Sequence, residues 1–424
     1  MKISAHTWTI FALTALAVTA SNPRPAFAGG KHHKKRLLVT FLEGTGRAER
    51  AEAAKEMGLT VTDDMDSLQV SVLESAGDVQ PQEFSKARKH PKVFMVEEDV
   101  SQNWLLESPV SFQASPFPSI ESVIEALGRP RRQPVPTPGP SPVNGGNPAA
   151  APSGNVPWGV ARVNAPAAWS SGQGAGVKVA VIDTGIDCTH PDLKCDFGAG
   201  MNIIDPTATP MDDNEHGTHV SGTIAGRGTG GPLGVAPKAT LIPVKVLDGS
   251  GSGSLSDIVK GINWAAGAGV DVINMSLGGP NGSPALQRAV NNALSAGVVV
   301  ICAAGNSGPA PDTVGFPGGY PGVIAVAASD THDQVAKFSS RGAAVAFIAP
   351  GVDIVSTIPG GGTAKLSGTS MASPHVAGLA ALAVERGAKG SSGVRAAFSA
   401  AATKLGGLAA TEQGAGMIDA SQLR

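Results

Sequence analysis

The sequence predicts an α/β protein in which a doubly wound, mostly parallel sheet follows a small α+β module. In the larger C-terminal part, short runs of Val, Ile and Ala alternate with helical stretches, which is typical of strands buried on both faces of a parallel sheet. In the N-terminal part, strand-like and helix-like segments follow the order β-α-β-β-α-β. The composition agrees, because 42% hydrophobic residues with 55 Gly and 32 Pro suit a core of small side chains joined by tight turns.

The C-terminal domain is expected over residues 153–424. Its strands are predicted from apolar runs at 177–182, 240–246, 270–274, 298–302 and 323–327. Helices are predicted between them, including 256–266 and 284–296. Because functional groups gather at the carboxyl ends of strands in open parallel sheets, we expect a site where these strands end.

The N-terminal module is expected over residues 29–105. Its strands are predicted at 36–42, 59–62, 68–74 and 93–96, and its helices at 47–57 and 81–90. This order is the split βαβ arrangement of ferredoxin-like folds. The module is therefore expected to fold as a unit of its own.

Two segments are expected to lie outside these domains. Residues 1–28 have the pattern of a secretion signal, with Lys2, an apolar stretch at 10–18 and a small-x-small cleavage pattern at its end. Residues 106–152 are rich in Pro, Gly, Ser and Ala and predict an extended linker. A short helix at 119–127 is expected within it, with Ser119 and Ser122 as competing caps.

Charge and cysteine content exclude several classes of function. A formal net charge of −2 with 16% charged residues gives no field that favours nucleic acid or an anionic membrane. Cys188 and Cys195 lie in one predicted loop, where a local disulfide and two free thiols both remain open because Cα geometry decides. Cys302 lies in an apolar run and is expected to be a small buried hydrophobe, not a nucleophile.

Two polar residues stand where a strand ends and where a helix begins. Asp183 ends the strand "VKVAVID" and, taken alone, is more typical of a helix cap or a turn. His216 opens "HGTHVSGTIAG", a segment of small residues that predicts a helix packed closely on its neighbours. His219 in the same segment is expected to be structural, because its spacing from His216 without an acidic partner is not a zinc signature.

Two more motifs contain groups suited to nucleophilic catalysis. Ser370 lies in "SGTSMASPHVAGLAALA", where Gly368 permits a sharp turn and Pro374 is expected in the first helical turn. The N-terminus of that helix favours negative charge near the Ser370 hydroxyl, although a cap would explain the serine alone. Asn306 in "CAAGNSG" can donate its amide to an oxyanion, or can be a turn residue.

Together these segments resemble the subtilisin-like serine proteases, or subtilases. "VIDTGID", "HGTHVSGTIAG" and "GTSMASPHVAG" are similar to the three catalytic motifs of that family, in its order of Asp, His and Ser. The resemblance covers nearly all of residues 156–424 and implies a subtilisin-like fold and a serine-type endopeptidase. An esterase of the α/β-hydrolase class would require G-x-S-x-G and the order Ser, Asp, His, which the sequence lacks.

The resemblance implies a role for each catalytic residue. Ser370 would attack the scissile carbonyl, and His216 would take the proton and pass it to the leaving amine. Asp183 would hold the imidazole in the right tautomer, and Asn306 would bind the oxyanion together with the backbone N–H of Ser370. No cofactor is expected for catalysis.

The resemblance also implies where a peptide binds. Two segments would sandwich an extended substrate as an added strand, and the walls and rim of the pocket for the residue before the cut would be small and uncharged. The residues concerned are Gly251, Ser252, Gly253, Ser276, Leu277, Gly278, Ala303, Ala304, Gly305 and Gly315. We therefore expect broad specificity with a preference for large hydrophobic residues before the cut.

The remaining expectations concern processing and partners. Residues 29–105 resemble the inhibitory propeptide of the family, which implies a secreted, self-processing zymogen cut at about 103–107. Asp192 is similar to a calcium ligand of the family, but the loop "RGTGGPLGVAP" is short, so a structural Ca²⁺ is not assigned. We expect a monomer that acts on polypeptides. The alternatives are a catalytically silent domain that binds peptides or serves at a surface and, among active proteases, an exopeptidase or a dedicated processing enzyme.

Overall fold

The computed structural model describes residues 36–77, 81–105 and 155–423. The predicted signal at 1–28, the linker at 106–152 and its helix at 119–127 lie outside the described residues. Within the ranges described, no helix combines the length and apolarity needed to cross a membrane.

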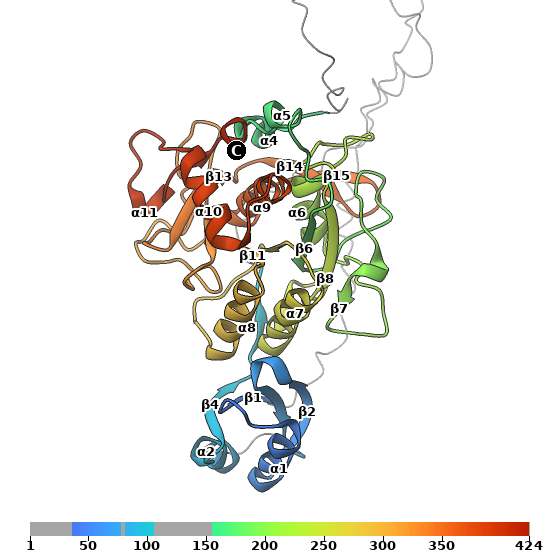
Figure 1. Ribbon diagram of the computed structural model, residues 1–424, viewed down its shortest axis with the longest axis vertical. Coiled ribbons are helices and arrows are strands. Elements are labelled where there is room, and N and C mark those ends of the chain that lie inside the picture. The colour runs from blue at the N-terminus through green and yellow to red at the C-terminus, as the bar shows by residue number, and fades with distance from the viewer. Residues whose placement is uncertain (1–35, 78–80, 106–154, 424) are drawn as a thin grey trace, which may run out of the picture. The chain divides into compact units, whose positions relative to one another are not determined.

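The larger domain is built on a seven-stranded sheet in which every neighbouring pair is parallel (Figure 1). In sheet order the strands are β13 (Val345–Pro350), β12 (Ile324–Ser329), β11 (Val299–Ala303), β10 (Val272–Met275), β6 (Lys178–Asp183), β8 (Thr240–Lys245) and β7 (Met201–Asn202). From β6 the chain runs to β7 at one edge, returns to β8 beside β6, and then builds outward from β10 to β13 on the other side. The strand order therefore reverses between β6 and β10, which is where such sheets form their binding crevice.

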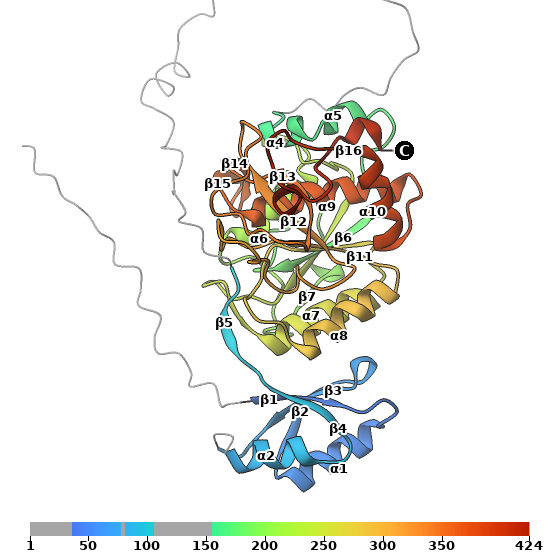
Figure 2. The same cartoon turned by 90° about the vertical axis from the view of Figure 1, so that its left-hand side faces the viewer.

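Helices cover both faces of this sheet, which confirms the predicted doubly wound α/β class. Figure 2 shows α7 (Leu255–Gly267) and α8 (Pro284–Ser295) side by side on one face, with α6 (His216–Ala225) and α9 (Thr369–Glu385) on the other. Strand β6 shows why its sequence is continuously apolar. Val179 and Val181 pack into the α6–α9 core, while Ala180 and Ile182 pack into the α7–α8 core.

Local sequence signals start and stop the covering helices. Ser254 caps α7 by accepting from the N–H of Asp257 at 3.1 Å, and Ser283 caps α8 in the same way from Leu286. The prediction for Pro374 was wrong: it lies inside α9, beyond the first turn. Proline has no backbone N–H, so the carbonyl of Ser370, four residues earlier, loses its helical donor. The hydroxyl of Ser276, which follows β10, donates to that carbonyl instead.

Several elements of the domain escaped the sequence prediction. Strand β13 forms the edge of the sheet, and β14 (Ile354–Ile358) and β15 (Gly362–Leu366) form an antiparallel hairpin that packs against α6. The smaller pieces are α4 (Trp158–Arg162), α5 (Ala165–Ala168), η2 (Phe197–Ala199), α10 (Gly390–Ala401), β16 (Ala402–Thr403), α11 (Ala410–Gln413), β17 (Met417–Ile418) and η3 (Ala420–Gln422). Cys188 and Cys195 form a disulfide with their Cα atoms 5.0 Å apart.

The N-terminal module has the predicted α+β order. Its four-stranded antiparallel sheet runs β2-β3-β1-β4, and two helices cover one face. Its elements are β1 (Arg36–Phe41), α1 (Arg47–Met57), β2 (Thr60–Met65), η1 (Asp66–Leu68), β3 (Val70–Glu74), α2 (Pro81–Lys89) and β4 (Val93–Glu98). The other face of the sheet places Leu38, Val70 and Val72 in the same apolar cluster as residues of α7 and α8.

Candidate active site

Asp183 and His216 meet at the carboxyl edge of the sheet. Asp183 is the last residue of β6, and His216 is the first residue of α6. The imidazole Nδ1–H donates to Asp183 Oδ1 at 2.8 Å, and the backbone N–H of Thr184 donates to the same oxygen at 2.7 Å. The two segments can approach this closely because residue 217 is glycine, where a Cβ would lie 2.1 Å from the carbonyl oxygen of Gly185.

The surroundings favour the charged form of His216. Burial disfavours the cation, but the charge of Asp183 and its hydrogen bond to the ring outweigh burial and raise the pKa of His216 above its ordinary value. The Asp183 carboxylate has no exposed surface, so its attraction is not screened by solvent. This pair is suited to accept a proton and to hold it for a short time.

Ser370 is the second residue of α9 and lies beside the end of β10. Its hydroxyl donates to the carbonyl of Ser276 at 3.0 Å, and the hydroxyl of Ser276 donates to the carbonyl of Ser370 at 2.8 Å. The carbonyl of Ser370 is the one that Pro374 leaves without an α-helical donor four residues later. Ser276 therefore replaces that lost hydrogen bond and fixes the backbone at the start of α9.

Asn306 follows β11 and is oriented by the residue before the serine. Its side-chain Oδ1 accepts from the backbone N–H of Thr369 at 3.0 Å and from the Thr369 hydroxyl at 2.9 Å. Because the amide is planar, these two bonds turn its NH₂ group away from Thr369. The asparagine is thus held as a donor beside the start of α9, as an oxyanion would require.

A strand of the same chain occupies the groove predicted for a substrate. Strand β5 (Ser101–Asn103) pairs antiparallel with β9 (Ser252–Ser254). After β5, the N–H of Trp104 donates to the carbonyl of Gly251, and the N–H of Gly278 donates to the carbonyl of Trp104, each at 3.0 Å. The groove therefore binds an extended chain by main-chain hydrogen bonds on both sides.

The other predicted binding residues lie after β10 and at or after the end of β11. Leu277 is fully buried in the core that also holds Trp104 of the strand bound in the groove. Ala303, Ala304, Gly305 and Gly315 lie together behind Asn306. The N–H of Gly315 donates to Ala304 at 2.9 Å, and the N–H of Gly305 donates to the Thr369 hydroxyl at 3.1 Å. These four residues bring no charge to the site.

Comparison with known proteins identifies the family of the chain. Residues 174–416 match the subtilase family, Peptidase S8. The chain belongs to the subtilase family. It is 52% identical to subtilisin E of Bacillus subtilis (strain 168) over 236 residues, which are 55% of this chain and 62% of that protein.

The match covers a larger share of the length of other relatives. The identity is 51% over 236 residues with subtilisin of Bacillus pumilus, covering 55% of this chain and 86% of the relative. It is 49% over 256 residues with subtilisin DY of Bacillus licheniformis, covering 59% and 93%. The chain spans less than two thirds of the first relatives, since it covers 62% of subtilisin E.

Two fully buried histidines of this subtilase differ from His216. His219 Nε2 donates to the carbonyl of Ile354 at 3.0 Å, and burial lowers its pKa to about 3. His375 donates to the carbonyl of Met371 at 2.9 Å, and burial lowers its pKa to about 4. Both are neutral structural donors. Burial also raises the pKa of the Cys302 thiol, which makes it a poor nucleophile.

The loop with a predicted resemblance to a calcium site contacts Asp192 through its backbone. The carboxylate of Asp192 accepts a hydrogen bond from the backbone of Thr229 within the loop. In the parts of the chain that the structure describes, no three His, Cys, Asp or Glu side chains come together as metal ligands would. We assign no cation there.

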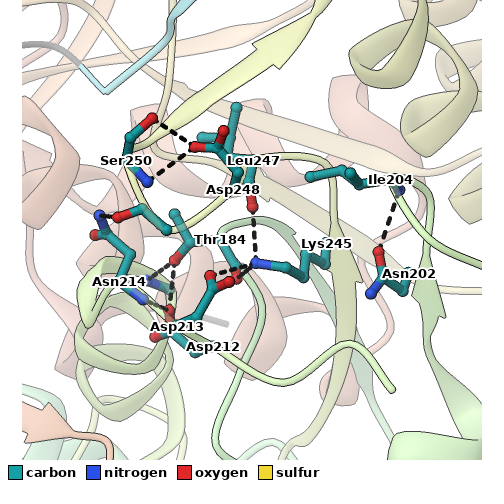
Figure 3. A network of polar contacts seen from close by, with 12 residues as sticks. Thr184, Asn202, Ile204, Asp212, Asp213, Asn214, Lys245, Leu247, Asp248 and Ser250 are labelled. Atoms are coloured by element: carbon teal, nitrogen blue, oxygen red, sulfur yellow. Dashed lines mark hydrogen bonds and ion pairs between the residues drawn. The ribbon is translucent and has the colours of Figure 1, made fainter. Parts of the chain in front are cut away.

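Two features of the site were missed at the sequence level. Thr369, directly before Ser370, orients Asn306, and its place inside "GTSMA" is a signal that could have revealed it. A polar network behind His216, drawn in Figure 3, joins Thr184, Asp212, Asp213 and Lys245. The acidic run "DDNEH" before His216 marks it in the sequence, but does not say which acid is buried.

Proposed function

We propose that this subtilase is a secreted serine endopeptidase that is made as a self-processing zymogen. The observation that carries the proposal is the buried Asp183–His216 hydrogen bond of 2.8 Å, formed in the chain that also sets Ser370 at a helix N-terminus. A serine hydroxyl reacts poorly at its ordinary pKa and needs such a base. The predicted signal at 1–28 supports export.

The proposed reaction assigns a role to Ser370, His216 and Asn306 in turn. The Ser370 hydroxyl leaves the carbonyl of Ser276, gives its proton to His216 Nε2 and forms a bond with the scissile carbonyl carbon. Asn306 and the N–H of Ser370 stabilise the resulting oxyanion. His216 then protonates the leaving amine as the C–N bond breaks. Water then gives a proton to His216 and bonds to the acyl carbon, and His216 returns that proton to Ser370 as the bond between the Ser370 oxygen and the acyl carbon breaks.

The N-terminal module is proposed to inhibit the site until it is cut away. Support comes from β5 and Trp104, which make the main-chain bonds that a substrate strand would make with Gly251 and Gly278. The Trp104 side chain is buried and donates to the carbonyl of Gly253 at 2.9 Å. The chain held in this way, residues 101–104, reaches into the predicted cleavage range of 103–107, which supports a cut close to it.

Broad specificity is proposed for the residue before the cut. The predicted pocket residues Ala303, Ala304, Gly305 and Gly315 are small and uncharged, so a large apolar side chain gains burial and a charged one finds no partner. A peptide panel should therefore be cut after Leu, Phe or Met. Strict cleavage after Arg or Lys would contradict this assignment.

The function is tested by intact mass and casein cleavage of full-length protein beside Ser370→Ala. Wild type should lose its N-terminal module and digest casein, while Ser370→Ala should stay at pro-form mass with kcat lowered about 10⁶-fold. Ser399→Ala, an exposed serine of α10, is the matched control and should behave as wild type. Equal processing and activity in wild type and Ser370→Ala would overturn the proposal. A wild type that binds casein without cutting it would favour a silent peptide-binding domain.

A further inference from the structure

One buried carboxylate near the site takes no part in the proposed reaction. Asp212 lies four residues before His216 and is only 4% exposed. Five hydrogen bonds reach it. Its Oδ1 accepts from the Thr184 hydroxyl at 2.8 Å and from the N–H groups of Asn214 and Glu215. Its Oδ2 accepts from the N–H and the hydroxyl of Thr218 at 2.8 and 2.6 Å.

These bonds join the two elements that supply Asp183 and His216. Thr184 follows Asp183 directly, and its N–H donates to the Asp183 carboxylate. The Thr184 hydroxyl also accepts from the N–H of Gly217, which follows His216. Thr218 belongs to the first turn of α6. Asp212 therefore holds the end of β6 and the start of α6 at once, as Figure 3 shows for Thr184 and Asp212.

We infer that Asp212 is a positioning residue that fixes His216 against Asp183 and supplies a second negative charge behind the imidazole. A buried carboxylate with five donors is costly to move, so the elements it ties keep one arrangement. These bonds then help to set the Asp183–His216 distance, although 33 positions separate the two residues along the chain. This inference rests on the proposed peptidase activity and names a residue that the reaction itself does not use.

The charge has a consequence for the acid limb of the pH profile. Burial lowers the pKa of His216, Asp183 raises it most, and Asp212 raises it further. Titratable groups of either sign lie on α6, on the elements packed against it and in the preceding loop: they include Asp183 of β6, Lys245 of β8, His219 on α6, His375 on α9, and Asp212, Asp213 and Glu215 in the loop. Strand β14, which also packs on α6, has no titratable side chain. Lys245 is paired with Asp213 at 2.6 Å, so its cation is largely compensated.

The test compares Asp212→Asn with Thr184→Val. The first variant removes the negative charge, and the second removes only the hydroxyl that bonds to Asp212 and to the N–H of Gly217. In Asp212→Asn, kcat should fall about 10- to 100-fold with little change in KM, as for a misplaced catalytic group. Its acid limb should move down by about half a pH unit or more, because loss of a negative charge lowers the pKa of His216. In Thr184→Val, kcat should fall while the acid limb stays in place.

The matched control is Asp205→Asn. Asp205 is an exposed carboxylate that also accepts from a backbone N–H and a hydroxyl, both of Thr207, and it should leave kcat and the acid limb unchanged. A readout that needs no activity is the ring pKa of His216 by NMR in full-length Ser370→Ala, with and without Asp212→Asn. The added change should lower it.

The possible outcomes separate this inference from the proposed function. An inactive wild type would overturn the peptidase proposal, while the NMR titration would still report on Asp212. An active wild type with unchanged kcat and acid limb in Asp212→Asn would overturn the inference alone. Should Asp212→Asn fail to fold, a folded Thr184→Val with wild-type kcat would also overturn it.

Discussion

The N-terminal module and the larger domain use buried charge in opposite ways. In the module, the side chain of Arg50 is fully buried and forms an ion pair with Asp64 at 2.7 Å. In the larger domain, the buried charges lie beside the site: Asp183 and Lys245 end strands, and Asp212 lies in the loop before α6. Buried charged side chains therefore stabilise the fold of the module, whereas in the larger domain they position the groups of the candidate active site.

The size of the apolar cores explains this difference. Ten buried residues make up the core between the sheet and helices of the module. The larger domain has two extensive clusters, one on each face of its sheet. A small core supplies little stability, so the module depends on its ion pairs. Changes at the module's charges should cost stability, and changes at the strand ends should cost activity.

The largest expected effect is the loss of the Arg50 ion pair. Arg50→Met in full-length Ser370→Ala should destabilise the module by about 3–5 kcal/mol, because Asp64 is left as a buried charge without its partner. Hydrogen exchange should then show loss of protection over residues 36–104 and retained protection in the sheet of the larger domain.

Arg47→Met is the matched control for this experiment. Arg47 contacts the same Asp64 carboxylate at 3.6 Å, but its side chain is 82% exposed, so its removal should cost at most about 1 kcal/mol. Equal loss of protection in both variants would mean that burial of Arg50 does not matter. The contrast between the two regions would then fail.

The second effect should appear in activity and not in stability. Asn306→Leu should lower kcat about 10²- to 10³-fold with KM nearly unchanged, the usual loss for one oxyanion donor. The unfolding temperature of Asn306→Leu should stay close to that of wild type, because two large apolar clusters stabilise the domain. A raised KM with normal kcat would instead assign Asn306 to substrate binding.

The sequence predicted the elements whose signals are local. Helix α1 has the predicted bounds 47–57, since Gly46 precedes it and Gly58 ends it with a φ of 83°. The buried strands of the sheet were recognisable from continuous apolar runs. Pairing between β5 and β9 was not predictable, because both strands are three residues long, polar, and joined only through the fold.

In the site, too, local motifs were predictable from the sequence and long-range contacts were not. The motifs indicated Asp183, His216 and Ser370, whose roles in the reaction remain predictions until they are tested. The residues that orient them depend on long-range contacts. In "DDNEH", Asp212 is buried and Asp213 exposes most of its side chain, and only the fold distinguishes them. Ser276 likewise acquires its bond to Ser370 because Pro374 frees a carbonyl on a distant helix.

The smallest expected effect concerns the charges where the two regions meet. Asp99 accepts from the N–H of Ser256 at 2.8 Å in the first turn of α7, and Glu97 accepts from the N–H of Ala285 at 3.0 Å in the first turn of α8. Burial raises the pKa of both carboxyl groups, although Arg36 and the helix N–H groups act in the opposite direction. Both acids therefore hold protons more firmly in the packed state than in a separated one.

A raised pKa in the packed state means that protonation favours packing. The contribution is fully present below the ordinary carboxyl pKa of about 4 and is lost as the pH rises through the raised values. In full-length Ser370→Ala, protection of β5 against hydrogen exchange should therefore fall modestly from acid to neutral pH. The double change Glu97→Gln and Asp99→Asn should remove this dependence, while Glu98→Gln, an exposed neighbour, should keep it. Protection that rises with pH would mean that the helix N-termini outweigh burial, and that the charge of these acids stabilises the contact.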